Sequence, residues 1–412
     1  MRVEGLPVRL NIIWNSIGSI VYFGCQWLLT VLITRISGYG VAGDFSLAVN
    51  ITNIFYCIAL FGMKTFQISD LQNKYRTGTY FSSRIVTGLL GFVSCIIFTL
   101  CYSFSIEQKI IICCYMVFKI VEATFDVFVG VFQKHSRMDQ IGKSLIIRGV
   151  VSLIAFVSLQ ILMQNLVISI LGMAFSSAIF ISIWDRGFAM KLEKIKIDWE
   201  FKSLQNLLIA CIPLVLYAII DTSIVSLPRI FLEHYHGNVA LGYYIAVATP
   251  AIIIQMIADY IYNPLITHFA LYYYEKNAKA FKHLLLKSML TLFGISALGI
   301  TGAIFLGDWG LALIFGSSIL PYTYLLLPAM FCALLVGVVR FLNTIMTIIR
   351  KLMVQLVVNI ITLVGSIVLS ILLIPSMSMQ GVNVVIAVVL LFEFVMLFVC
   401  IVVLASNHFK SN

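Results

Sequence analysis

The stretch "GYGVAGDFSLAV", Gly38–Val49, follows one apolar segment of the chain and runs directly into the next. A second stretch, "GNVALGYYIAVA", Gly237–Ala248, stands in the same relation to two later apolar segments. Both fit the pattern G-x4-G-x-[FY], in which the glycines permit a tight turn and a close approach of helices. We therefore interpret the two stretches as corresponding positions in two repeated halves.

Apolar segments long enough to cross a membrane recur from one end of the chain to the other. Of its 412 residues, 61% are hydrophobic and only 11% are charged, whereas soluble domains carry about 25% charged residues. A helix of about 20 apolar residues crosses the ~30 Å hydrocarbon layer, and the segments lack the alternation of barrel strands. The sequence predicts an all-α polytopic membrane protein with about twelve transmembrane helices, at residues 11–34, 45–66, 83–104, 109–132, 145–163, 165–184, 205–229, 241–265, 284–306, 319–346, 352–374 and 382–405.

The domain organisation follows from the repeat. Six spans in each half give a parallel repeat, so we expect two pseudo-symmetric six-helix bundles, residues 1–185 and 204–412, with the substrate site between them. Residues 186–203 form the most charged stretch. Four apolar residues of this stretch share one helical face, and they are Phe188, Leu192, Ile195 and Trp199. The pattern predicts an amphipathic linker helix on the cytoplasmic membrane surface, with a solvated linker as the alternative.

The distribution of basic residues predicts the orientation. If the N-terminus is cytoplasmic, nearly all of the 27 lysines and arginines fall at the cytoplasmic side, and only Arg35, Lys109 and Arg229 lie in outer loops. We expect both termini to be cytoplasmic. The same bias accounts for the net charge of +10 and for the basic aromatic stretch 272–287 without a nucleic-acid partner.

Three ionisable residues share one face of the span 109–132. Lys119, Glu122 and Asp126 are spaced i, i+3, i+7 near the midplane, where an ionisable side chain costs about 2.5–3.5 kcal/mol. We expect this face to line a polar cavity, with Lys119 and Glu122 paired across one turn and Asp126 left as the excess acid. Glu122 or Asp126 could then take up a coupling H⁺ or Na⁺. Alternatively, the pair neutralises itself and Asp126 bonds a neighbouring helix.

Other charges in or near the spans are further candidates for binding. Arg340 is the best buried cation for a diphosphate, because a guanidinium offers forked donors to phosphate oxygens. Arg35 and Arg229 lie near the outer ends of spans, and Lys64 lies at an inner end where a lipid would enter. These three are equally well explained as interfacial anchors. The remaining candidates are acids: Asp221, Asp259 and Glu393, of which Glu393 can pair with Arg340 or Lys119.

Metal and nucleotide chemistry find little support in the sequence. The nine cysteines form no C-x-x-C pair, so neither a zinc site nor a disulfide framework is expected. His234 and His236 are interpreted as residues of a short loop, and we expect no metal. No G-x4-GK[ST] sequence is present, which argues against ATP hydrolysis by this chain.

The stretch "LITRISGYGVAGDFSLAVNITNIF" resembles polysaccharide flippases of the Wzx type. These flippases belong to the multidrug/oligosaccharidyl-lipid/polysaccharide exporter superfamily. The shared features are the arginine before a Gly-rich turn, the [FY]-S-L-A entry into span two and the twelve spans in two bundles. The resemblance implies a MATE-like flippase fold in a bacterial inner membrane, with a central cavity whose basic residues face a pyrophosphate. In the family an aspartate is closely followed by a basic residue late in span seven, whereas Asp221 here precedes Arg229 by eight residues.

The resemblance also implies a function. The substrate would be an undecaprenyl-pyrophosphate-linked oligosaccharide, such as an O-antigen unit for lipopolysaccharide or a teichoic acid unit, and partners would include a polymerase and chain-length proteins. Two alternatives stay open: a cation-coupled multidrug exporter of the same superfamily, and a membrane enzyme that polymerises or ligates polysaccharide. The enzyme is disfavoured because such enzymes need a sizeable outer loop, and the outer loops expected here are short.

Overall fold

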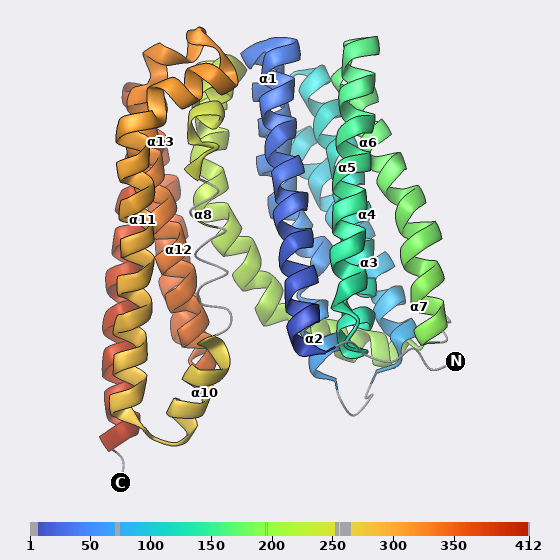
Figure 1. The fold of residues 1–412 in the computed structure, drawn as a ribbon, viewed down its shortest axis with the longest axis vertical. Coiled ribbons are helices and arrows are strands. Elements are labelled where there is room, and N and C mark those ends of the chain that lie inside the picture. The colour runs from blue at the N-terminus through green and yellow to red at the C-terminus, as the bar shows by residue number, and fades with distance from the viewer. Residues whose placement is uncertain are drawn as a thin grey trace. The chain divides into compact units, whose positions relative to one another are not determined.

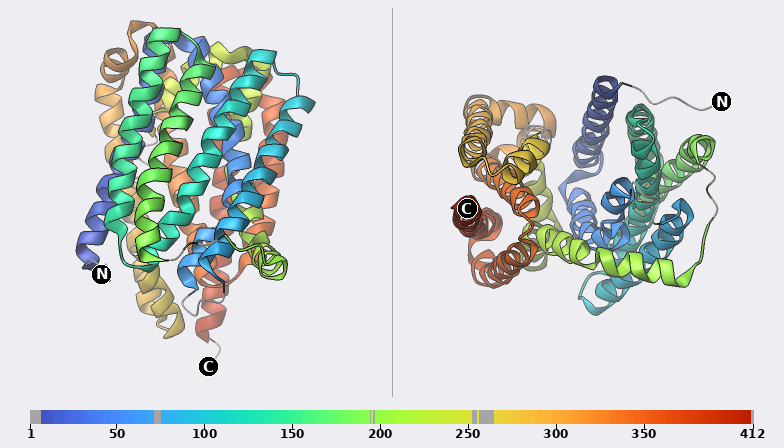
Figure 2. Two further views of the ribbon diagram at one scale, coloured as in Figure 1. Left: turned by 90° about the vertical axis from the view of Figure 1, so that its right-hand side faces the viewer. Right: turned by 90° about the horizontal axis from the view of Figure 1, so that it is seen from below.

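The computed structural model of the chain describes residues 7–70, 75–193, 195, 197–251, 255 and 265–410. Among these residues the regular elements are all helices (Figures 1 and 2). The chain divides into two compact units, residues 1–222 and 223–412, which we call unit 1 and unit 2.

Unit 1 is built from long helices that pack side by side (Figure 2, left). Helix α1 packs against α3, α4 and α5, and α4 also packs against α6. The elements of this unit are α1 (Val8–Leu60), α2 (Met63–Ser69), α3 (Thr77–Cys101), α4 (Ile106–Lys134), α5 (Met138–Met163), α6 (Leu166–Phe180), the π-helix η1 (Ile181–Asp185), α7 (Arg186–Leu192) and the part of α8 (Phe201–Ala248) up to Thr222.

Unit 2 contains the remainder of α8 and the helices that follow it. Helix α12 packs extensively against α13 and also contacts α11. The elements after α8 are α10 (Ile266–Tyr274), α11 (Ala278–Phe315), the 3₁₀ helix η3 (Ser317–Leu325), α12 (Leu326–Ile348) and α13 (Leu352–Lys410).

The helices agree with a multi-pass membrane protein. Eight helices within the described residues are long and apolar enough to cross a membrane. Three of them, α1, α8 and α13, contain a break. Helices α1 and α13 each accommodate two of the predicted spans, whereas α8 holds the span 205–229 and only the first residues of the span 241–265. Helix α4 is also long enough to cross a membrane, but its charged residues exclude it from the eight helices that are identified by length and composition alone. Most of the predicted span 241–265 lies beyond Ala248, largely outside the described residues.

The repeated glycine pattern marks equivalent breaks in α1 and α8. Gly38 has φ 82° and ψ 175°, and Gly237 has φ 82° and ψ 172°. This backbone region is open almost only to glycine. A Cβ added at either position would meet nothing within 4 Å, so the constraint comes from the backbone angles and not from crowding. The structure thus supports the interpretation of the two stretches as a repeat.

Small residues let α1 approach α5 closely. A Cβ on Gly142 would overlap the carbonyl of Trp14, and a Cβ on Gly18 would overlap the backbone of Gly142. Close backbone approach through glycine is a common means of packing helices in membranes, where burial of apolar surface gives no driving force. This contact brings residues of α5 next to the first part of α1.

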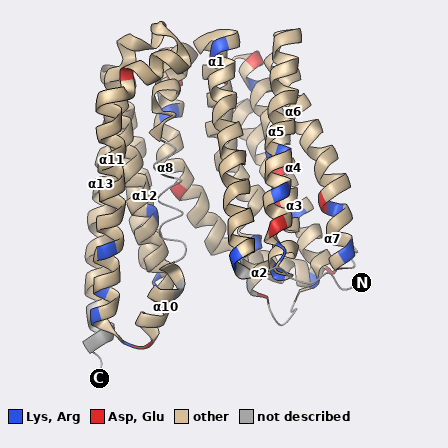
Figure 3. Ribbon diagram, viewed as in Figure 1, with Lys and Arg blue, Asp and Glu red and all other residues tan. Residues whose placement is uncertain are grey.

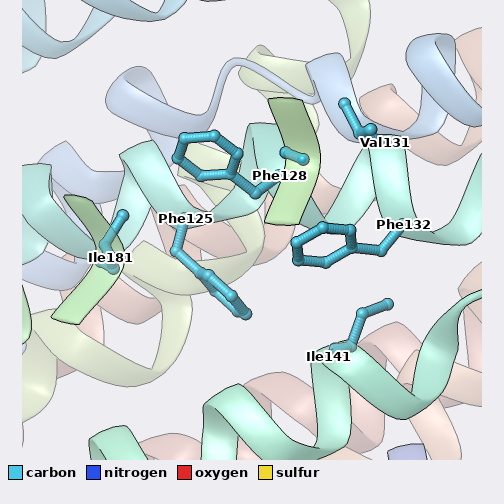
Figure 4. Close-up of a cluster of buried hydrophobic side chains, with 7 residues drawn as sticks. Phe125, Phe128, Val131, Phe132, Ile141 and Ile181 are labelled. Atoms are coloured by element: carbon cyan, nitrogen blue, oxygen red, sulfur yellow. The ribbon is translucent and has the colours of Figure 1, made fainter. Parts of the chain in front are cut away.

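The predicted amphipathic helix over residues 186–203 is wrong beyond Leu192. The helix ends there, because Glu193 is extended and residues 195 and 197–200, which the structure describes, are not helical. The side chain of Glu193 accepts a hydrogen bond from Thr77 and pairs with His135 at 2.7 Å. Three of the four apolar residues expected to face the membrane pack instead against a cluster around Phe132 and Phe128 (Figure 4), and they are Phe188, Leu192 and Ile195. The fourth, Trp199, is 59% exposed.

Replacement of either break glycine by alanine tests the backbone constraint. We expect Gly38→Ala and Gly237→Ala each to lower the free energy of unfolding by about 1–3 kcal/mol, because alanine is strained at these angles. The measurement is the thermal unfolding midpoint of the protein in detergent. Gly24→Ala is the control, since Gly24 is helical and open to an added Cβ. Equal midpoints for all three variants would contradict the constraint.

Candidate functional site

Three of the charged residues of helix α4 have partners on four other helices of unit 1. They are Lys119, Glu122 and Asp126, and all three are half-buried. Asp126 lies eight residues before the end of α4 at Lys134, which is roughly 12 Å along the helix. The site therefore lies toward the end of unit 1 that carries α2 (Figure 3).

Asp126 is held by two cations. Its Oδ2 lies 2.8 Å from Nη2 of Arg84 on α3, and its Oδ1 lies 3.2 Å from Nζ of Lys64 on α2. Arg84 is only 4% exposed, and it also donates to the carbonyl of Ala59 near the end of α1. Thr87 Oγ1 donates to the same carbonyl at 2.9 Å. These contacts join α1, α2, α3 and α4 around one carboxylate.

Glu122 is held by α5 and α1. Its Oε1 lies 3.1 Å from Nη1 of Arg148, and its Oε2 accepts a 2.5 Å hydrogen bond from the hydroxyl of Tyr22. Arg148 is 1% exposed, and its guanidinium lies 3.8 Å from the ring centroid of Phe125. An arginine is suited to this position because its weakly hydrated, planar guanidinium can stack on an aromatic face while it faces a carboxylate.

The predicted pairing of Lys119 with Glu122 is wrong. Glu122 pairs with Arg148, while the ammonium of Lys119 lies 5.0 Å from the ring centroid of Tyr56 and 5.6 Å from that of Tyr115. The prediction of Asp126 as an excess acid is also wrong, and its contacts with Arg84 and Lys64 agree instead with the alternative that Asp126 bonds a neighbouring helix. Glu122 and Asp126 both find their cations on neighbouring helices, which spacing along one helix cannot reveal.

The balance of charge at the site is positive. Among the described residues of unit 1, the cluster brings together four basic side chains, Lys64, Arg84, Lys119 and Arg148, and two acidic ones, Glu122 and Asp126. We call this set the cation cluster. Asp185 of η1, which accepts a 2.9 Å bond from Ser144, is a third acid near Arg148 and still leaves a basic excess. An interior with more cations than anions favours a negatively charged ligand.

The cluster retains donors that the protein does not use. Nε of Arg84 and Nε of Arg148 are buried and make no hydrogen bond within the described part of the chain. Lys64 and Lys119 are more accessible, since the Lys64 side chain is 45% exposed and Lys119 is half-buried. The two lysines are therefore the least enclosed cations of the cluster and form its edge.

The other predicted site residues lie outside the cation cluster. In unit 1, Arg35 is exposed on α1, and Asp221 is half-buried on α8 next to Thr222, whose hydroxyl lies 3.3 Å from Cys57 Sγ. In unit 2, Arg229 and Arg340 are half-buried, and Glu393 is buried and accepts a 2.9 Å bond from Asn343. Asp259 lies outside the described residues.

Sequence reasoning missed Arg84 and Arg148. The expected orientation places both among the basic residues at the cytoplasmic side, yet both fall inside predicted spans, 83–104 and 145–163. Their position within a span indicates a functional or paired residue, because an arginine within a span must find a partner or a water-filled cavity. The predicted loop around His234 is also wrong: α8 continues through it to Gly237, and His236 Nε2 lies 2.9 Å from the carbonyl of Ile374.

The fold is that of a known class of membrane transporters. It is similar to an inward-facing multidrug resistance MATE family transporter of the MOP superfamily (TM-score 0.70, 13% identity, 98% of this chain and 100% of that one). It is also similar to the Lipid II flippase MurJ in an inward closed conformation (TM-score 0.72, 13% identity, 96% of this chain and 90% of that one). The predicted MATE-like flippase fold is confirmed.

The chain is also similar in sequence to a protein of polysaccharide biosynthesis. The chain is 24% identical over 374 residues to the "Capsular polysaccharide biosynthesis protein CapF" of Staphylococcus aureus, a match that covers 90% of this chain and 93% of that protein. No protein-family model matches the chain. These similarities agree with the resemblance to Wzx-type polysaccharide flippases.

Neutralising one member of a buried ion pair tests the geometry at Glu122. We expect Arg148→Gln to lower the free energy of unfolding by about 3–5 kcal/mol, because it leaves a buried carboxylate without its cation. The double variant Glu122→Gln/Arg148→Gln should recover a large part of that loss. Thermal unfolding midpoints in detergent measure both, with the exposed Arg186→Gln as the control. Losses that simply add in the double variant would contradict the pairing.

Proposed function

We propose that the protein is a flippase that moves undecaprenyl-pyrophosphate-linked oligosaccharide units across the bacterial cytoplasmic membrane by alternating access. The observation that carries this proposal is the positive cation cluster inside unit 1, where Arg84 and Arg148 are almost fully buried. A diphosphate presents several anionic oxygens, and guanidinium and ammonium groups bind such oxygens through charge-assisted hydrogen bonds. The similarity to CapF supports a role in polysaccharide biosynthesis, and the structural similarity to MurJ supports a lipid-linked substrate.

The charge of the cluster distinguishes this proposal from its nearest alternative. A multidrug exporter for cationic drugs needs acids that are available to the drug. Glu122 and Asp126 are each occupied by a cation of the protein, and the excess charge is positive. The cluster therefore favours an anionic substrate over a cationic drug. A polymerising or ligating enzyme is disfavoured by the similarity of the fold to transporters.

In this proposal the two lysines at the edge of the cluster meet the diphosphate first. Lys64 is exposed and Lys119 is half-buried, whereas the two arginines are almost fully buried and hold the acids that position the helices. In unit 2 we assign the same kind of contact to Arg340, because its forked donors match phosphate oxygens. Coupling to H⁺ or Na⁺ stays a prediction, and Glu393 is a buried acid that could serve it.

Transport by the purified protein tests the proposal. We expect Lys119→Gln and Lys64→Gln each to slow the flipping of an undecaprenyl-pyrophosphate oligosaccharide in proteoliposomes by about tenfold or more, since a hydrogen bond to a charged group contributes about 1.5–3 kcal/mol. Lys191→Gln, which removes an exposed charge of unit 1 outside the cluster, should flip at the wild-type rate.

Two results would count against the flippase. One is full flipping activity in the double variant Lys64→Gln/Lys119→Gln. The other is transport of cationic drugs, but not of the lipid-linked oligosaccharide, by the wild-type protein. Folding of each variant is checked by its elution profile in detergent, so that loss of transport is not confused with loss of structure.

A further inference from the structure

An apolar groove lies between α11 and α13 of unit 2. Its volume is about 470 Å³. Helix α11 lines it with Leu286, Met289 and Phe293, and α13 lines it with Phe398 and Val402, among other apolar residues. The charged residue of the lining is Lys282, which lies at the beginning of α11.

The end of the groove at Lys282 is basic. Lys279 precedes Lys282 by three residues, so the two side chains share one face of α11, and both are exposed. The first acid along α11 is Asp308, more than six turns further on. The first turn of the helix adds the partial positive charge of its backbone N–H groups. Glu275, which follows α10, is an exposed acid near this end. Lys276, Lys279 and Lys282 in the same stretch outnumber it, so a ligand headgroup here would meet a positive field.

The length of the groove matches one leaflet of a membrane. From Lys282 to Phe293 the helix rises roughly 16 Å. Half of the hydrocarbon layer is about 15 Å thick. An acyl chain that hangs from a headgroup at the two lysines would therefore lie along the groove to about the bilayer midplane. An undecaprenyl chain is far longer than one leaflet, so the groove fits an ordinary acyl chain better.

We propose that this groove binds an anionic glycerophospholipid. The headgroup phosphate lies at Lys279 and Lys282, and one acyl chain lies against Met289, Phe293 and Val402. A basic pocket beside membrane-spanning helices is the kind of surface that recognises anionic lipid headgroups. The site belongs to unit 2 alone and does not depend on the transported substrate.

Lipid retention by the full-length protein tests this site. The protein in detergent is mixed with phosphatidylglycerol or with phosphatidylcholine of the same acyl chains, and bound lipid is measured by native mass spectrometry. We expect the wild type to bind phosphatidylglycerol with clear preference. Lys279→Gln/Lys282→Gln should bind it roughly 25-fold more weakly, since each lysine near an anionic headgroup contributes about fivefold. Val402→Trp, which fills the groove, should also lose the lipid.

Two matched controls make the test specific. Arg350→Gln/Lys351→Gln removes the same charge from exposed positions of unit 2 outside the groove lining, and Val403→Trp adds the same bulk at an exposed position outside it. Both should bind phosphatidylglycerol like the wild type. Equal binding of the two lipids, or equal losses in variants and controls, would overturn the proposal. Displacement of phosphatidylglycerol from the groove by undecaprenyl phosphate would overturn the assignment to a phospholipid.

Discussion

The cost of a charge in hydrocarbon is the constraint on which unit 1 depends. Glu122 and Asp126 lie within a helix whose neighbours are mostly apolar, and each would cost several kcal/mol without a partner. Arg148 of α5 and Arg84 of α3 supply the cations. Because the acids are four residues apart on α4, their two arginines fix the rotation of α4 between α3 and α5. Tyr22 adds a contact to α1.

The same arrangement leaves a positive interior, and this links the fold to its proposed task. Neutralising Glu122, Asp126 and Asp185 would need only three cations, yet the cluster holds four. A purely structural network gains nothing from surplus charge, since an uncompensated cation is itself costly. Surplus positive charge is functional where the ligand is an anion. The pyrophosphate of a lipid-linked oligosaccharide supplies the missing negative charge in this account.

The features that could be predicted from the sequence are those that depend on neighbouring residues along the chain. Span length follows from the thickness of the bilayer, and the breaks at Gly38 and Gly237 follow from a short glycine pattern whose backbone angles the structure shows to be nearly identical. Partners across helices could not be predicted. The meeting of Glu122 with Arg148 depends on how α5 packs in the bundle, which close glycine contacts with α1 determine. The linker over residues 186–203 also has a helical sequence pattern. Its helix nevertheless ends at Leu192, where the next residue, Glu193, pairs with His135 of another part of the chain.

Selective binding of a diphosphate is the most direct test of the central claim. The affinity of the wild-type protein for undecaprenyl pyrophosphate is compared with its affinity for neutral undecaprenol and for a cationic drug of similar hydrophobicity. We predict that the diphosphate binds at least about tenfold more tightly than the alcohol, and that added salt weakens its binding. A diphosphate that binds no better than the alcohol, together with tight binding of the cationic drug, would contradict the account.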